Sequence, residues 1–152
     1  AVTRSEAKRA DLIESGADHV VVGTGDFSAE VKELTDGEGV DVVIDNVGTP
    51  VFDAAYNSLA RHGRYALVGQ LFSDELSINP ARIFCKRAQL LGVGSVSRSQ
   101  LEDVIELTRS GLLTSRTAMV VPLDEVARAH ELVEQAAMTG RVVLSYEGNN
   151  HG

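Results

Sequence analysis

Residues 39–50 read GVDVVIDNVGTP, and residues 63–70 read GRYALVGQ. Each stretch is an apolar run that ends in a glycine, as expected of a buried strand followed by a tight turn. The residues between them, 50–61, have helical periodicity and begin with proline, which is favoured in the first turn of a helix. The order strand, helix, strand predicts a parallel α/β sheet with glycine turns at the carboxyl ends of the strands. In open sheets of this kind, ligands bind at those ends.

The composition indicates one core of ordinary size and excludes several classes of partner. The chain has 152 residues, of which 43% are hydrophobic, and a formal net charge of −8. No segment combines clustered Lys and Arg with aromatic residues, so no nucleic-acid partner is expected. No apolar run approaches membrane-spanning length, and residues 1–8 lack the apolar core of a signal peptide, so no membrane partner is expected. The single cysteine, Cys85, fits a reducing compartment, and a cytoplasmic protein is the expectation.

Strand and helix patterns alternate along most of the chain. This alternation predicts a doubly wound parallel sheet, the α/β fold class. The expected strands are residues 1–2, 18–22, 40–44, 64–68, 89–96, 118–121 and 141–146, and the expected helices are 5–16, 29–35, 50–61, 80–86, 99–111 and 124–139.

The stretches quoted above resemble the medium-chain dehydrogenase/reductase superfamily, as do VTRSEAK at residues 2–8 and TGRVVL at residues 139–144. That superfamily includes zinc alcohol dehydrogenases, quinone oxidoreductases and enoyl-CoA reductases. The resemblance implies that a catalytic domain, the first Rossmann strand and the glycine-rich phosphate turn precede Ala1, so that the chain is a C-terminal fragment. It implies an incomplete NAD(P)-binding Rossmann domain at residues 1–116, the C-terminal strand-helix-strand of the catalytic domain at 117–146, and a flexible tail at 147–152.

The second strand of an NAD-preferring Rossmann domain commonly ends in Asp or Glu, which accepts from the ribose 2′-hydroxyl. Here the strand ends in Thr3, Arg4 and Ser5, and Lys8 follows one helical turn later. Cationic and hydroxyl groups at this place suit a 2′-phosphate, so NADP(H) is favoured over NAD(H). The alternative is that Arg4 and Lys8 are a solvated helix start.

Further contacts with the cofactor are implied at three glycine turns and one basic residue. In the family such turns pass the ribose and nicotinamide half of the cofactor, mostly through backbone groups, and a basic residue before the last strand lies near its phosphates. The implied residues are Asn46, Val47, Gly48, Gly69, Gln70, Gly94, Ser95 and Arg141.

No catalytic acid, base or metal site is predicted within the chain. The four histidines and Cys85 do not have metal-ligand spacing, and Asp41 and Asp45 are interpreted as strand-end residues. In the zinc-dependent branch of the family, the metal ligands lie mostly in the N-terminal domain. Zinc is therefore expected only in a full-length protein, and this chain is expected not to bind it.

The resulting hypothesis is an NADP(H)-preferring oxidoreductase that transfers hydride to or from a quinone, enoyl, aldehyde or alcohol substrate. This chain would carry the cofactor-binding part and would be inactive alone. The alternatives are a non-catalytic α/β nucleotide-binding or regulatory module and a methyltransferase-type fold, against which Thr3 and Arg4 argue. The apolar edge strand from Gln89 to Val96 predicts a homodimer whose contact includes Leu91, Val93 and Ser95.

Overall fold

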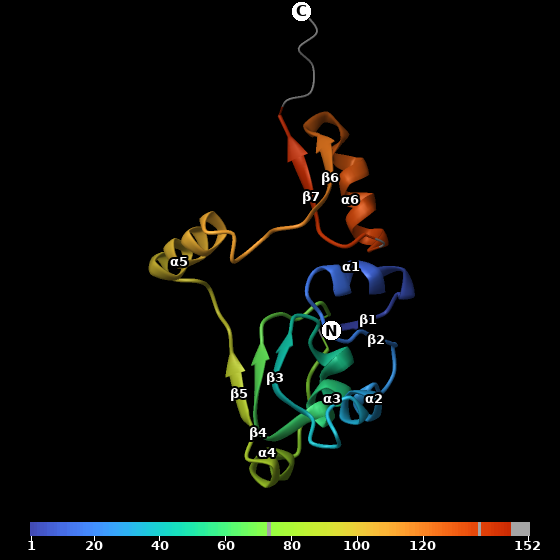
Figure 1. The fold of residues 1–152 in the computed structure, drawn as a ribbon, viewed down its shortest axis with the longest axis vertical. Coiled ribbons are helices and arrows are strands. Elements are labelled where there is room, and N and C mark those ends of the chain that lie inside the picture. The colour runs from blue at the N-terminus through green and yellow to red at the C-terminus, as the bar shows by residue number, and fades with distance from the viewer. Residues whose placement is uncertain (73, 137, 147–152) are drawn as a thin grey trace, which may run out of the picture. The chain divides into compact units, whose positions relative to one another are not determined.

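A computed structural model describes residues 1–72, 74–136 and 138–146 of the chain (Figure 1). The chain divides into two compact units. The first combines Ala1–Arg4 with His19–Ser95, and the second combines Ser5–Asp18 with the chain from Val96 onward. The predicted tail at 147–152 lies outside the described residues.

The first unit is a parallel α/β structure, which confirms the predicted fold class. Strands β3, β4 and β5 form one parallel sheet in that order, and β1 pairs with β2 in a separate parallel ladder. Helix α3 packs against β3 and β4, and α2 packs beside α3. The strands are β1 (Val2–Thr3), β2 (Val21–Val22), β3 (Val40–Asp45), β4 (Leu59–Leu67) and β5 (Gln89–Gly92), and the helices are α2 (Ser28–Glu33), α3 (Thr49–Ser58) and α4 (Pro80–Lys86).

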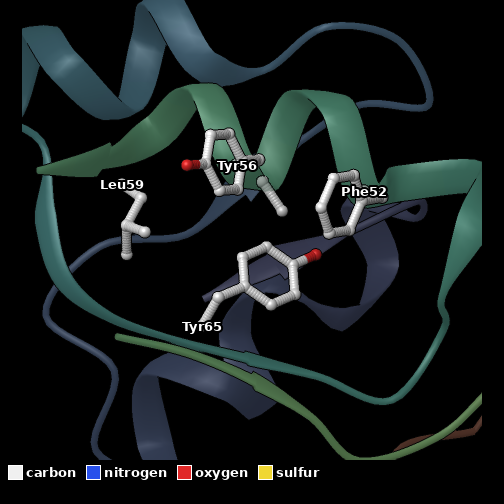
Figure 2. Close-up of a cluster of buried hydrophobic side chains, with 5 residues drawn as sticks. Phe52, Tyr56, Leu59 and Tyr65 are labelled. Carbon is white, nitrogen blue, oxygen red and sulfur yellow. The ribbon is translucent and has the colours of Figure 1, made fainter. Parts of the chain in front are cut away.

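The core of the first unit lies between α3 and the sheet. Figure 2 shows Phe52 and Tyr56 of α3 facing Tyr65 of β4, with Leu59 beside them. The ring centroids of Phe52 and Tyr65 are 4.9 Å apart, and those of Phe52 and Tyr56 are 5.5 Å apart. Tyr65 is 0% exposed. Three stacked or tilted rings bury a large apolar area and hold α3 on the sheet.

The helix predicted at 50–61 is three residues too long. It ends at Ser58, and β4 begins at Leu59. A bulge near the start of β4 explains the error: Val40 pairs with Leu59, but Val42 pairs with Arg64, so the intervening residues of β4 bow out of the ladder. His62 has φ 65° in this bulge, so it is not a helix cap.

The second unit contains α1 and the C-terminal strand-helix-strand. Strands β6 and β7 are parallel and flank α6 in sequence. The guanidinium of Arg116, just before β6, contacts the carboxylates of Asp11 at 2.7 Å and Glu14 at 3.3 Å on α1. The elements are the 3₁₀ turn η1 (Glu6–Lys8), α1 (Arg9–Glu14), α5 (Arg98–Arg109), β6 (Thr117–Pro122), η2 (Leu123–Glu125), α6 (Val126–Gln135) and β7 (Arg141–Ser145).

Helix α5 begins earlier than the sequence pattern predicts. Ser99 was the expected cap, but Ser97 caps the helix, because its Oγ accepts from the Gln100 N–H while the Gln100 side chain accepts from the Ser97 N–H. This reciprocal pair is a capping box. Among the residues that the structure describes, no helix has the length and apolar character needed to cross a lipid bilayer.

Candidate functional site

The chain leaves the same edge of the β3-β4-β5 sheet after each strand. Asp45 is level with Leu67, and Leu67 is level with Gly92, so the carboxyl ends of the three strands are aligned. The chain bends after β3 and after β4, whereas after β5 it continues as an irregular segment without a turn. The Val93 N–H donates to the Leu67 carbonyl at 2.9 Å, which carries the pairing one residue beyond β5. The segments after these strands contain the predicted residues Asn46, Val47, Gly48, Gly69, Gln70, Gly94 and Ser95.

Asp45 fixes the first turn. Its side chain is 4% exposed, and one oxygen, Oδ1, accepts from the backbone N–H groups of Val47 at 2.8 Å and Gly48 at 3.0 Å. The other oxygen, Oδ2, accepts from the hydroxyl of Tyr65 at 2.7 Å. Burial, and then the hydrogen bond to the Asp45 carboxylate, raise the pKa of Tyr65. Asp45 is therefore fully engaged in holding the turn.

Gln70 joins the second turn to the first. Its Oε1 accepts from the Thr49 N–H at 3.0 Å, and its Nε2 donates to the Thr49 hydroxyl at 2.8 Å and to the Asp74 carbonyl at 3.1 Å. Gly48 has φ 90°, and a Cβ at this position would overlap the Gln70 side-chain amide. Glycine is required at position 48 both for its backbone conformation and for the space it leaves. The Gln70 side chain thus has protein partners for both of its polar atoms.

The remaining glycines of the edge differ in the space around them. A Cβ on Gly69 would lie 3.1 Å from the Asn46 carbonyl oxygen, so the first and second turns are in close contact. The Leu71 N–H also donates to the Val47 carbonyl at 3.0 Å. A Cβ on Gly94 would have no heavy atom within 4 Å, so its backbone borders open space. A ligand atom could therefore contact the Gly94 backbone at the place where other residues have a Cβ.

A cavity of about 500 Å³ lies beside the first two turns. Its size is within the range of small-molecule sites, and its walls are mostly apolar with a few polar groups. The ionisable residue in the lining is an acid, Asp74, and no cationic residue contributes. This lining suits an uncharged ring with hydroxyl or amide groups better than a phosphate. The lining residues are Gly48, Thr49, Phe52, Leu67, Val68, Gly69, Gln70, Phe72, Asp74 and Leu76.

Of the predicted cofactor residues, Gly48, Gly69 and Gln70 line this cavity, and the others do not. Thr3 and Arg4 lie at the end of β1 in the first unit, where the Thr3 carbonyl accepts from the Gly23 N–H at 2.9 Å. Ser5 precedes η1 and Lys8 is its last residue, both in the second unit. Arg141 is the exposed first residue of β7, also in the second unit, and its N–H donates to the Arg116 carbonyl at 2.9 Å.

Three residues of the site, Thr49, Asp74 and Tyr65, are not among those predicted from the sequence. Thr49 follows the helix cap Gly48 and contacts the side chain of Gln70. The hydrogen bond between Tyr65 and Asp45 depends on the register in which Tyr65 lies level with Val43 and Leu67 lies level with Asp45, and a single sequence does not reveal that register. Within residues 1–72, 74–136 and 138–146, no group of three or more His, Cys, Asp or Glu side chains could hold a metal ion.

A family model of zinc-binding dehydrogenases matches residues 1–110. The chain belongs to this family. The predicted resemblance to the medium-chain dehydrogenase/reductase superfamily is thereby confirmed. The chain is 33% identical over 144 residues to the acryloyl-coenzyme A reductase of Sulfurisphaera tokodaii, with 94% of this chain and 42% of that protein covered.

Two further comparisons bear on the cofactor. The D-arabinose 1-dehydrogenase (NADP(+)) of Saccharolobus solfataricus is 32% identical over 147 residues, covering 95% of this chain and 41% of that protein. The crystal structure of an NAD-dependent alcohol dehydrogenase superposes with a TM-score of 0.87 at 32% identity, covering 95% of this chain and 43% of that one. The relatives of this chain are NAD(P)-dependent oxidoreductases, and the chain spans less than half of their length.

Proposed function

We propose that this chain carries the cofactor-binding part of an NADP(H)-preferring oxidoreductase that transfers hydride to or from a quinone, enoyl, aldehyde or alcohol substrate. The observation that carries the proposal is the alignment of three strand ends at one edge of a parallel sheet, with a cavity of about 500 Å³ beside the turns that follow β3 and β4. Ligands bind at such edges in open α/β sheets. The oxidoreductases that are similar to the chain support the reaction class.

The residues at this edge fit the half of a dinucleotide that consists of the nicotinamide and its ribose. The turn at Asn46, Val47 and Gly48 would contact the ribose, with its backbone held by the buried Asp45 carboxylate. The backbone at Gly69, Gln70, Gly94 and Ser95 would contact the nicotinamide carboxamide, and the open space at Gly94 supports close approach. The nicotinamide, when bound, accepts or gives the hydride, while these residues bind and orient it.

The phosphates would be held elsewhere in the chain. Thr3, Arg4, Ser5 and Lys8 would bind the 2′-phosphate that distinguishes NADP(H) from NAD(H), and Arg141 would lie near the other phosphates. Arg4 and Arg141 are both exposed and therefore available to a ligand. None of the described residues that line the cavity is a cation, which supports a placement of the phosphates away from it.

The remaining parts of the enzyme would lie outside this sequence. Residues 1–116 would be an incomplete Rossmann domain and 117–146 the C-terminal part of a catalytic domain, so the chain alone would be inactive. Val42 and Ile44 lie on the same face of β3 and are 43% and 73% exposed, which supports a covering layer on that face supplied from outside this sequence. The catalytic groups and any zinc would belong to that outside part, and the whole protein would act in the cytoplasm.

The test compares the affinities of NADPH and NADH for the full-length protein and for an Arg4→Ala variant. Arg98 provides the matched control, because its side chain is 93% exposed and its Nε lies 3.6 Å from a carboxylate oxygen of Glu102 on the same helix. We expect Arg4→Ala to weaken NADPH roughly tenfold or more, the scale of a lost charge-assisted hydrogen bond, and to leave NADH unchanged. Arg98→Ala should change neither. An unchanged preference for NADPH after Arg4→Ala would remove Arg4 from the phosphate site.

A second variant tests the nicotinamide turns. Gly94→Ala adds a methyl group into open space, so stability should change little, but a bound carboxamide would lose its room. We expect weaker binding of both NADPH and NADH with an unchanged melting temperature. Unchanged affinity for both cofactors would contradict the placement of the nicotinamide at this edge.

A further inference from the structure

A second cavity, of about 420 Å³, lies at the opposite end of the same strands. Its lining includes Gly37 and Glu38, which precede β3, and Leu59 and Arg61, which begin β4. It shares no lining residue with the cavity at the carboxyl ends. All of its lining residues belong to the first unit: Lys32, Gly37, Glu38, Tyr56, Leu59, Arg61, Arg82, Cys85 and Lys86.

This cavity concentrates positive charge in an acidic protein. Four of its lining residues, Lys32, Arg61, Arg82 and Lys86, are cationic, whereas the chain as a whole has a net charge of −8. Glu38 in the lining and Asp53, which forms an ion pair with Arg82 at 2.6 Å, offset only half of this charge. In the part of the chain that the structure describes, Lys32, Arg61 and Lys86 form no ion pair.

Two of the cations are held in fixed positions. The ammonium of Lys86 donates to the carbonyls of Leu59 at 2.6 Å and Tyr56 at 2.8 Å, where α3 ends. The ammonium of Lys86 and the guanidinium of Arg82 lie 5.0 and 5.1 Å from the centroid of the Tyr56 ring, which attracts both. Partial burial, and then the charges of Lys32 and Arg82, lower the pKa of Lys86. The positive groups therefore repel one another and lack sufficient counter-charge.

We propose that this second cavity is a binding site for the phosphate group of a small phosphorylated molecule. Guanidinium and ammonium groups are the usual protein ligands of phosphate. The excess of two positive charges matches a phosphate monoester, which carries roughly two negative charges at neutral pH, better than it matches a single carboxylate. Lys32 and Arg61 contact the phosphate, while the fixed positive charges of Arg82 and Lys86 increase the positive electrostatic potential in the cavity. The site does not depend on the proposed function, because it lies at the other end of the sheet.

A cysteine in the lining of this cavity allows ligand binding to be measured. Cys85 is the only cysteine in the sequence, and its side chain is exposed at the cavity lining. The test measures the rate at which neutral iodoacetamide alkylates Cys85 as inorganic phosphate replaces sodium chloride at constant ionic strength. We expect phosphate to slow alkylation with a saturating dependence on its concentration.

Variants of the lining cations then distinguish phosphate bound in the cavity from a general effect of salt on the alkylation of Cys85. Lys32→Gln and Arg61→Gln change exposed side chains, so the fold should persist, as far-UV circular dichroism can verify. Each should weaken phosphate protection about fivefold or more, whereas Arg98→Gln, on the second unit, should not change it. ³¹P NMR line broadening of phosphate should be lost in the same two variants.

Two results would overturn the proposal. One is alkylation that is equally fast in phosphate and in chloride, which would indicate an adventitious ion only. The other is protection by phosphate that persists unchanged in both Lys32→Gln and Arg61→Gln. Because none of these readouts involves NADPH, their failure would leave the proposed oxidoreductase function intact.

Discussion

Replacing Tyr65 by phenylalanine removes a single buried hydrogen-bond donor and little else. The hydroxyl donates to Asp45 Oδ2 at 2.7 Å, in a place where Asp45 is 4% and Tyr65 is 0% exposed. The ring itself remains, so the contacts with Phe52 and Tyr56 persist and no cavity larger than the lost oxygen forms. A hydrogen bond to a charged acceptor contributes about 1.5–3 kcal/mol, and we expect Tyr65→Phe to lower the free energy of unfolding by that amount.

The assay is urea denaturation followed by far-UV circular dichroism, with two matched controls. The Tyr56 hydroxyl donates to a neutral acceptor, the Arg82 carbonyl, at 3.0 Å, so Tyr56→Phe should cost about 0.5–1.5 kcal/mol. Tyr146 is 86% exposed, so Tyr146→Phe should cost nothing measurable. If Tyr65→Phe lowers the free energy of unfolding by no more than Tyr56→Phe does, the Asp45–Tyr65 hydrogen bond does not stabilise the turn as argued.

Three further outcomes are expected. Gly39→Ala should destabilise the chain by roughly 1–3 kcal/mol, measured by urea denaturation, because Gly39 has φ 88° and a Cβ there would collide with the Ser58 carbonyl. If the protein is a homodimer through β5, Leu91→Lys should shift it toward monomer in analytical ultracentrifugation, and a monomeric wild type would refute the dimer. The pKa of Tyr65 is raised above its ordinary value of 10.0, so above pH 10 the unfolded chain loses a proton that the folded chain retains. The stability that protonated Tyr65 contributes is therefore complete below pH 10 and declines as the pH rises further. The free energy of unfolding between about pH 8 and 11 should therefore decline less in Tyr65→Phe than in Tyr146→Phe, and equal slopes would contradict the assignment.

The order of strands and helices could be predicted from the sequence because each element has a local signal. Apolar runs that end in glycine predicted β3 and β4, and both are parallel strands in the structure. Element boundaries were less accurate where a non-local contact decides them. The start of β4 at Leu59 depends on pairing with Val40, and no pattern within residues 59–63 indicates that partner.

The candidate site was predictable in its location but not in its internal contacts. The glycine turns at the strand ends indicated where a ligand would bind. The side chain of Gln70, however, contacts Thr49 across 21 residues of sequence, and the packing of Gly48 against Gln70 is the reason why position 48 must be glycine. Such a pairing depends on the register between β3 and β4, which a single sequence does not reveal.

The two cavities at opposite ends of the strands differ in charge, and this difference separates their ligands. The cavity at the carboxyl ends has Asp74 in its lining and no cation, so a phosphate there would be repelled by a carboxylate and lack a counter-charge. The cavity at the amino ends has four cations around a single lining carboxylate, so a nicotinamide, which is neutral in NADPH and cationic in NADP⁺, would not be attracted there. A phosphorylated molecule that binds beside Lys32 and Arg61 should therefore not compete directly with the nicotinamide half of NADPH. Both α3 and β4 connect the two cavities, since Phe52 and Leu67 line the first cavity and Tyr56 and Leu59 line the second.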